Sequence, residues 1–230
     1  MVRALLIDMD DTLFDEGDYV RSGFRAVAEA VAKDHPGVSA DDLHGEMIAE
    51  LAASGRGKVF DAALARAGLA PTPERIADLV AAYRTHRPAI AFWPGVAEAL
   101  KELKTDYRLA VITDGLGIMQ RRKVAALGLE PLVDLVVYCW ELDAPKPHPR
   151  PYRVALEALG STPSEALVIG DNPAHDLAAA EALGCGFIRV AAGRFAAEPS
   201  PALATVARFA DIPHLLRTTE IGRIPCPQRP

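Results

Sequence analysis

Two carboxylates follow a short apolar run near the N-terminus of this 230-residue chain. Ala4 to Ile7 lead directly into Asp8 and Asp10, so a run of strand length ends in acids. Residues two apart in an extended chain project to the same side, so these carboxylates can converge on one cation or one phosphorus atom. We interpret the run as a buried parallel strand that ends where open α/β sheets bind ligands. An acidic turn that caps the next helix is the alternative for this motif alone.

The predicted strand at 108–113 also ends in polar residues. Thr113 is followed by Asp114 and Gly115, and a helix is expected to begin soon after them. Free backbone N–H groups at the start of a helix favour an anion. The segment therefore predicts an anion site, and a plain strand-to-helix turn is the alternative.

Two later segments add a cation and two more carboxylates. A proline stands on either side of Lys146, and the fixed φ of proline limits where the ammonium group can go. The apolar strand predicted at 166–170 runs into Asp171, and Asp176 is expected in the first turn of the next helix. Each residue alone fits a solvated charge or a helix cap. Together at one sheet edge, these groups are what metal-assisted phosphoryl transfer through an aspartyl intermediate needs.

The remaining sequence predicts the elements that position these groups. Alanine-rich amphipathic segments predict four successive helices, at 17–34, 41–54, 57–68 and 73–87. Helices and strands then alternate, with helices at 95–104, 117–128, 149–159 and 174–183 and strands at 108–113, 134–138, 166–170 and 186–190. Such alternation indicates a parallel sheet with helices on both faces. We predict an α/β fold, with a doubly wound, Rossmann-like core at 1–14 and 94–218, an inserted α-helical cap at 15–93, and a tail at 219–230.

The composition limits the partners of the protein. The net charge of −6 argues against a nucleic-acid polymer or an anionic membrane, because such partners are bound by clustered Lys and Arg. A phosphorylated ligand should therefore be small and accompanied by a metal ion. Three widely spaced cysteines suggest neither a disulfide framework nor a zinc site, and no apolar stretch has the length of a membrane span. We expect a cytoplasmic protein, as a monomer or a homodimer.

The motifs resemble those of the haloacid dehalogenase-like hydrolase superfamily. They occur in the family's order, as Asp8-Met9-Asp10-Asp11-Thr12, Thr113, Lys146, and Gly170-Asp171 with Asp176, and the resemblance extends to about Asp211. The helical insert is similar to the cap of the phosphoglycolate phosphatase and beta-phosphoglucomutase branch. The stretch after Thr113 resembles nucleotidases and N-acylneuraminate-9-phosphatase in Gln120, Lys123 and Leu127-Gly128-Leu129.

The resemblance implies a phosphatase with defined catalytic and metal-binding residues. Asp8 would attack phosphorus, and Asp10 would protonate the leaving alkoxide and then deprotonate the hydrolytic water. Mg²⁺ would bind the Asp8 and Asp171 side chains and the backbone carbonyl of Asp10. Asp176 would contact the metal waters or Lys146, with direct ligation as the alternative.

The resemblance also implies how the phosphate is bound. Lys146, the Thr113 hydroxyl and the backbone N–H groups of Asp114 and Gly115 would hold the transferring group. The family often has Gly at position 11 and Asn at position 114, where this chain has Asp. Because the contact at 114 is expected to be mainly through the backbone, activity should survive, but the added charge should disfavour some polyanionic substrates.

Several activities remain open at this point. Asp10 argues against a dehalogenase, because a leaving halide needs no proton and dehalogenase relatives lack this acid. A Schiff-base phosphonate hydrolase would need a buried cap lysine, for which Lys33 and Lys58 are the candidates. A phosphomutase would share every core residue, and a non-catalytic phosphate-binding regulatory module is the alternative from another class. We assign substrate choice to the loop 54–60, where Arg56 can bind an acidic or phosphorylated leaving group, against the alternative of a solvated helix–helix turn.

Overall fold

The computed structural model describes residues 1–222, and the chain divides into two compact units. The first unit contains Met1–Glu16 and the chain from Ala91 onward, and the second contains Gly17–Ile90. The sequence placed these boundaries at 14/15 and 93/94. Within the predicted tail, Glu220–Gly222 form a short 3-10 helix, whereas 223–230, with Cys226, lie outside the described residues.

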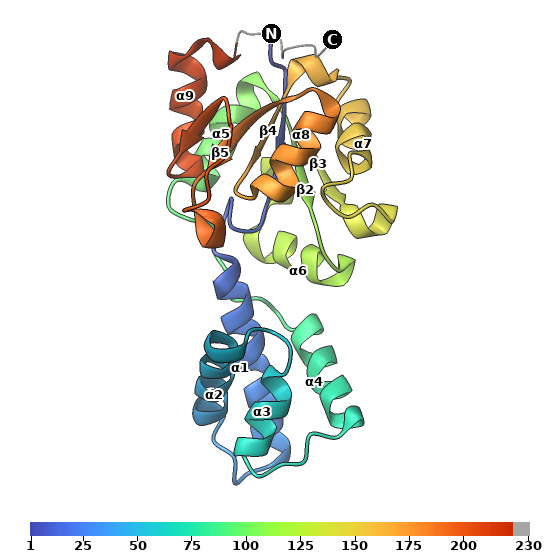
Figure 1. The fold of residues 1–230 in the computed structure, drawn as a ribbon, viewed down its shortest axis with the longest axis vertical. Helices are drawn as coiled ribbons and strands as arrows, with labels where there is room; N and C mark the ends of the chain where they lie inside the picture. The colour runs from blue at the N-terminus through green and yellow to red at the C-terminus, as the bar shows by residue number, and fades with distance from the viewer. Residues whose placement is uncertain (223–230) are drawn as a thin grey trace. The chain divides into compact units, whose positions relative to one another are not determined.

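Six parallel strands form the sheet of the first unit, in the order β3-β2-β1-β4-β5-β6 (Figure 1). Their bounds are β1 Ala4–Ile7, β2 Arg108–Thr113, β3 Leu135–Tyr138, β4 Ala166–Gly170, β5 Gly186–Val190 and β6 Ala204–Val206. The register places Ile7 between Val111 of β2 and Ile169 of β4, so β1 is central. All four β1 residues are buried apolar side chains, as a central parallel strand requires. The predicted α/β doubly wound sheet is confirmed.

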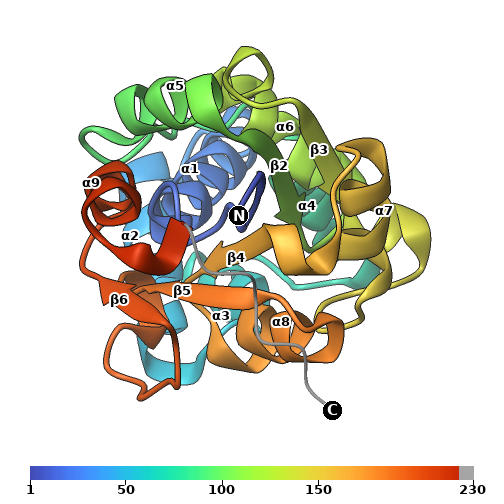
Figure 2. The same cartoon turned by 90° about the horizontal axis from the view of Figure 1, so that it is seen from above.

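Helices cover both faces of this sheet (Figure 2). One face packs against α7 and α8 through buried residues that include Leu6, Ile112, Tyr152, Val168 and Ala179. Helices α5 and α9 contact each other, and α5 also contacts β2. The bounds are α5 Val96–Asp106, α6 Gly117–Leu127, α7 Arg150–Ala158, α8 Ala178–Leu183 and α9 Ile212–Thr218.

The second unit is built from four helices around its own apolar core. These helices are α1 Glu16–Asp34, α2 Ala40–Ser54, α3 Val59–Arg66 and α4 Pro73–Thr85. The buried cluster includes Phe24, Met47, Leu64 and Leu79. Side-chain caps start two of the helices, because Ser39 accepts a bond from the backbone N–H of Asp42 and Thr72 from that of Arg75.

Some predicted elements need correction. The helix predicted at 57–68 is shorter, Val59–Arg66, because 55–58 form the connection from α2. The helix predicted at 174–183 is a π-helical turn, Pro173–Leu177, followed by α8. Strand β6 and helix α9 were not predicted. Short 3-10 helices also occur, at Glu130–Leu132, Cys139–Leu142, Pro163–Glu165, Gly193–Phe195 and Phe209–Asp211.

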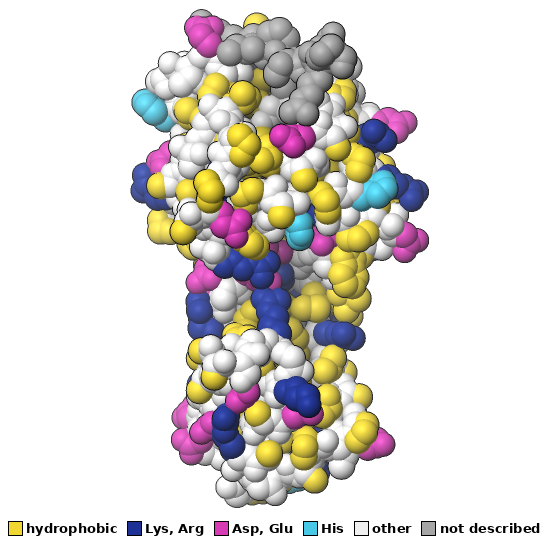
Figure 3. All heavy atoms as spheres, viewed as in Figure 1, with side chains coloured by type: hydrophobic (Ala, Val, Ile, Leu, Met, Phe, Trp, Pro, Cys, Tyr) yellow, Lys and Arg dark blue, Asp and Glu magenta, His cyan; other side chains and the backbone are white. Residues whose placement is uncertain are grey.

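The surface shown in Figure 3 carries acidic and basic side chains interspersed with hydrophobic ones on the first unit. Among the described residues, none of the helices combines the length and apolar character that crossing a bilayer demands.

Candidate active site

Asp8 lies at the carboxyl end of the central strand. Its backbone N–H donates to the carbonyl of Ile169 at 2.8 Å, which holds the residue against the end of β4. One carboxylate oxygen accepts a bond from Lys146 Nζ, and the other accepts one from Thr12 Oγ1 at 3.3 Å. Both oxygens of Asp8 are therefore oriented by side chains from the surrounding loops.

Lys146 links two carboxylates inside the first unit. Its side chain is 2% exposed, and its Nζ donates to Asp8 and to Asp176 Oδ1, the latter at 2.8 Å. Burial by itself would lower the pKa of this lysine, but the carboxylates of Asp176 and Asp8 raise it well above its usual value. The ammonium group is therefore charged and held between the two acids.

Three carboxylates form a cluster that fits a divalent cation. Oxygens of Asp8, Asp171 and Asp176 all lie within 4.8 Å of one another. In the described part of the chain, Asp171 Oδ2 is buried without a hydrogen-bond partner. The pKa of Asp8 is raised to about 7 and that of Asp171 to about 9, first by burial and then by the neighbouring carboxylates. Clustered carboxylate oxygens with an open acceptor are the donor set that Mg²⁺ prefers.

Asp176 is positioned by an irregular turn that the sequence did not reveal. It lies in the π-helical turn Pro173–Leu177, a geometry often found at functional sites. Its Oδ1 also accepts a bond from the buried Tyr152 hydroxyl at 3.1 Å. A side chain at Gly170 would overlap the Asp176 carboxylate, so glycine at 170 makes this close approach possible.

The end of β2 brings the second motif to the same edge of the sheet. Thr113 is fully buried, and Gly115 has a φ of +124°, a conformation that favours glycine. Asp114 Oδ1 accepts a bond from the backbone N–H of Lys146 at 3.1 Å. This side chain therefore ties the second motif to the lysine loop, a role that the sequence analysis did not assign, and the backbone contact expected at 114 with a phosphate stays a prediction.

Two buried residues of α6 hold the Asp10 carboxylate, and the sequence analysis gave neither a role. Lys123 Nζ donates to Asp10 Oδ1 at 2.6 Å, and Gln120 Nε2 donates to Asp10 Oδ2 at 2.8 Å. The Gln120 amide also lies 2.7 Å from Thr113 Oγ1. A signal was present in the sequence, because both residues fall on the same helical face as Val124 and Leu127, where apolar side chains are expected.

The remaining predicted site residue, Arg56, belongs to the second unit. It is exposed on the segment 55–58 between α2 and α3, and its predicted role in substrate binding stays a prediction. Predicted site residues of the first unit line a pocket of about 120 Å³, and those on its wall are Asp8, Asp10, Asp114, Lys146, Asp171 and Asp176. Residues that the sequence analysis did not assign also line this pocket, among them Glu16, Asn172, His175, Arg194 and Phe195.

Comparisons with known proteins place the chain among phosphatases and related hydrolases. The chain is 30% identical to a glyceraldehyde 3-phosphate phosphatase of Methanopyrus kandleri, over 85% of this chain and 86% of the relative. It is 31% identical to a phosphoserine phosphatase of Thermus thermophilus, over 80% and 86%. A subfamily IA hydrolase structure from Geobacter sulfurreducens matches with a TM-score of 0.68 and 26% identity, over 94% of this chain and 96% of that one.

A family model matches the chain across residues 2–184, which include Asp8, Thr113, Lys146, Asp171 and Asp176. The matched segment thus carries all four motifs and the strands that end in them. The predicted family resemblance is confirmed: this chain belongs to the haloacid dehalogenase-like hydrolases.

Proposed function

We propose that the protein is a Mg²⁺-dependent phosphatase that hydrolyses small phosphomonoesters through an aspartyl-phosphate intermediate. One observation carries this proposal: the buried Lys146 joins Asp8 to Asp176 beside the unpartnered oxygen of Asp171. The names of the related phosphatases support the same reaction class. We expect a small phosphorylated metabolite as substrate, in the cytoplasm.

The first half of the reaction transfers the phosphoryl group to Asp8. A carboxylate oxygen of Asp8 forms a bond to phosphorus as the ester P–O bond breaks, and Asp10 gives a proton to the departing alkoxide. Lys146 and the Thr113 hydroxyl stabilise the phosphoryl oxygens, assisted by the backbone N–H groups of Asp114 and Gly115. The alcohol product then leaves.

The second half releases phosphate and restores the enzyme. Asp10, now ionised, takes a proton from a water that attacks the phosphorus of the aspartyl phosphate. The acyl-phosphate P–O bond breaks, which regenerates the Asp8 carboxylate. Asp8, Asp171 and the Asp10 carbonyl would hold Mg²⁺, and Asp176 would orient its waters. The ion supplies positive charge that lets an anionic nucleophile approach an anionic ester.

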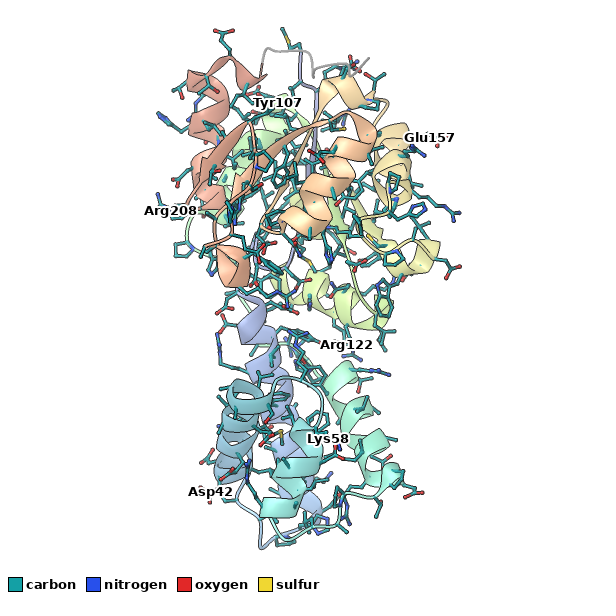
Figure 4. All side chains as sticks on the ribbon, viewed as in Figure 1. Asp42, Lys58, Tyr107, Arg122, Glu157 and Arg208 are labelled. Atoms are coloured by element: carbon teal, nitrogen blue, oxygen red, sulfur yellow. The ribbon has the colours of Figure 1, made fainter. Side chains whose placement is uncertain are left out.

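The structure bears on the competing activities. Lys33 and Lys58 are both exposed, and Lys58 precedes α3 in the second unit (Figure 4), which disfavours a Schiff-base lysine because its pKa must be lowered by burial. The Lys123 and Gln120 contacts to Asp10 favour hydrolysis of an ester over dehalogenation, which has no use for an acid at this position. A phosphomutase is the second candidate, because it would use the same core residues.

Phosphate release from p-nitrophenyl phosphate and from a panel of small phosphomonoesters tests the proposal. We expect turnover that requires Mg²⁺ and that stops when the ion is chelated. If the protein is a phosphomutase, it should instead isomerise a sugar phosphate without net release of phosphate. The absence of both reactions in a folded, Mg²⁺-binding protein would favour the regulatory module.

We expect Mg²⁺ to stabilise the protein more at high pH than at low pH. Burial raises the pKa of Asp8 and Asp171 above the value near 4 that these groups have in the unfolded chain. Without metal, the protonated carboxyl groups therefore favour the folded state at low pH, and this stabilisation is lost as the pH rises toward 7–9. Mg²⁺ binds the ionised carboxylates and reverses this loss. The rise in Tm on adding Mg²⁺ should be larger at pH 8.5 than at pH 6, by at least about 3 °C.

Thermal unfolding of the chelator-treated protein, with and without Mg²⁺, measures this difference. Asp171→Asn is the matched control, because it removes one titrating ligand and should reduce the pH dependence of the gain. Equal gains at the two pH values would contradict the prediction.

We expect Lys123→Met to impair esters of poor leaving groups selectively. Lys123 holds Asp10 in place, and a general acid contributes about 10²–10⁴-fold only where the leaving oxygen needs a proton. The kcat/KM for an alkyl phosphate should fall about 100-fold. That for 2,4-dinitrophenyl phosphate should fall only a few-fold.

A plot of kcat/KM against leaving-group pKa should therefore be steeper for Lys123→Met than for the unmodified protein. Lys101→Met, at an exposed position of α5, is the control and should leave the slope unchanged. A uniform loss across all esters would mean that Lys123 supports the fold rather than the acid.

A further inference from the structure

The pocket around Asp8 is strongly acidic, and one exposed arginine side chain lies among its lining residues. Seven of its lining residues are Asp or Glu, and among its described lining residues the Lys and Arg side chains are Lys146 and Arg194. Lys146 is only 2% exposed and is bound to two carboxylates. The Arg194 side chain is 58% exposed, so it can reach a ligand that enters the pocket.

The backbone around Arg194 is fixed from two sides. On one side, Asp11 Oδ2 accepts a bond from the Arg194 backbone N–H at 3.4 Å. On the other, the buried Arg189 guanidinium donates to the carbonyls of Phe195 and Glu198. The segment that carries Arg194 is thus held in place before any ligand binds, which lowers the entropy cost of binding.

Asp11 gives this chain a connection that glycine cannot make. Its φ of +54° lies in the left-handed region, a conformation that glycine adopts at lower cost than other residues. Gly193 has a φ of +61°, and any side chain there would overlap Asp11. The close approach of these two residues, together with the carboxylate of Asp11, ties the Arg194 segment to the loop that carries Asp8 and Asp10.

The guanidinium group of Arg194 is oriented but weakly paired. It stacks over the Phe195 ring at 4.7 Å from the centroid, which leaves its N–H edges available. Its ion pair with Glu16 is long at 3.8 Å and involves an exposed arginine, so this pair contributes little to stability. A ligand carboxylate that accepts two parallel bonds would be a stronger partner.

We propose that Arg194 binds a carboxylate on the leaving-group side of the substrate, so that the enzyme prefers phosphomonoesters of small hydroxy acids. This inference rests on the proposed phosphatase function. A carboxylate matches the two-donor edge of guanidinium and brings one charge. A second phosphate would bring about two charges into a pocket with seven acids, which disfavours bisphosphates.

Matched pairs of esters that differ only in the carboxylate test the proposal. The pairs are 2-phosphoglycolate with 2-hydroxyethyl phosphate, and 3-phosphoglycerate with glycerol 3-phosphate. The readout is the ratio of kcat/KM for the acid to that for its alcohol counterpart. We expect Arg194→Gln to lower this ratio by about 10- to 100-fold, mainly through KM, and Arg194→Lys to lower it less because one charge remains without the two-donor edge.

Two further variants separate position from charge. Asp11→Gly keeps the backbone conformation but removes the connection, so it should lower the ratio in the same direction. Arg208→Gln removes an exposed arginine that pairs with Asp211 in the same unit (Figure 4), and it should leave the ratio unchanged.

Three results would overturn the inference. The ratio could be unchanged in Arg194→Gln, or it could fall in Arg56→Gln and not in Arg194→Gln, which would place recognition in the second unit. In the third, Arg194→Gln would lower kcat/KM more for propane-1,3-diyl bisphosphate than for the carboxylate esters. That result would mean that Arg194 binds a phosphate group.

Failure of the phosphatase function itself would be visible separately. Turnover would then be absent for every ester, including the alcohol counterparts. In that case the binding of 2-phosphoglycolate with Mg²⁺, measured calorimetrically in Asp8→Asn with and without Arg194→Gln, decides the inference. A Kd at least about tenfold weaker in the double variant supports it, and an equal Kd overturns it.

Discussion

Asp8→Asn is expected to lower kcat for every phosphomonoester by roughly 10³-fold or more. The amide has no anionic oxygen to attack phosphorus, so no aspartyl phosphate can form. Asn has nearly the size of Asp, and it removes one charge from a cluster whose members raise one another's pKa. The variant should therefore fold, so a loss of activity would come from the missing nucleophile rather than from unfolding.

Rapid quenching in acid with a ³²P-labelled ester gives the direct measurement. Labelled protein should accumulate transiently with the unmodified enzyme and be absent with Asp8→Asn. Asp106→Asn, at the exposed C-terminal end of α5, is the matched control and should retain full turnover. Turnover that survives in Asp8→Asn would remove Asp8 as the nucleophile.

Lys146→Met is expected to lower both activity and stability. Loss of the cation leaves Asp8 and Asp176 facing each other in a buried site, and breaking a buried ion pair costs about 3–5 kcal/mol. Without Lys146 the pKa of Asp8 rises further, so at low pH the carboxylate is neutral and the destabilisation is small. The loss of unfolding free energy should therefore be larger at pH 8 than at pH 5.5, and kcat should fall by roughly 10³-fold.

Urea unfolding of the metal-free protein at the two pH values measures the stability effect. Lys101→Met provides the control for loss of a surface lysine. A destabilisation that is independent of pH would mean that packing of the lysine side chain matters more than its charge. Full activity in the variant would remove Lys146 from the mechanism.

The strands that end in functional residues could be predicted because each is a compact apolar run. The runs ending at Ile7, Thr113 and Gly170 are buried on both faces of the sheet, so their sequences are nearly continuously hydrophobic. Strand β6 was not predicted because it has only three residues and none of them is fully buried, so it gives no apolar pattern. The π-helical turn escaped because its residues also fit an α-helix.

Contacts between distant residues were the part that the sequence could not supply. Lys123 and Asp10 are 113 positions apart, and Arg194 lies 183 positions from Asp11. Periodicity reveals which face of a helix is buried, but it does not reveal which loop that face meets. The side-chain role of Asp114 was missed for the same reason, since its acceptor oxygen finds a backbone N–H 32 residues away.

The strand order has a consequence for the synthesis of the protein. The central strand β1 leaves the ribosome first, but its neighbours β2 and β4 follow about one hundred and one hundred and sixty residues later. Asp8 is thus made early and gains Lys146 and Asp176 as partners only when most of the chain has emerged. A nascent or truncated chain that ends before Asp176 carries the nucleophile without the groups that activate it, so catalytic competence arises in one late step.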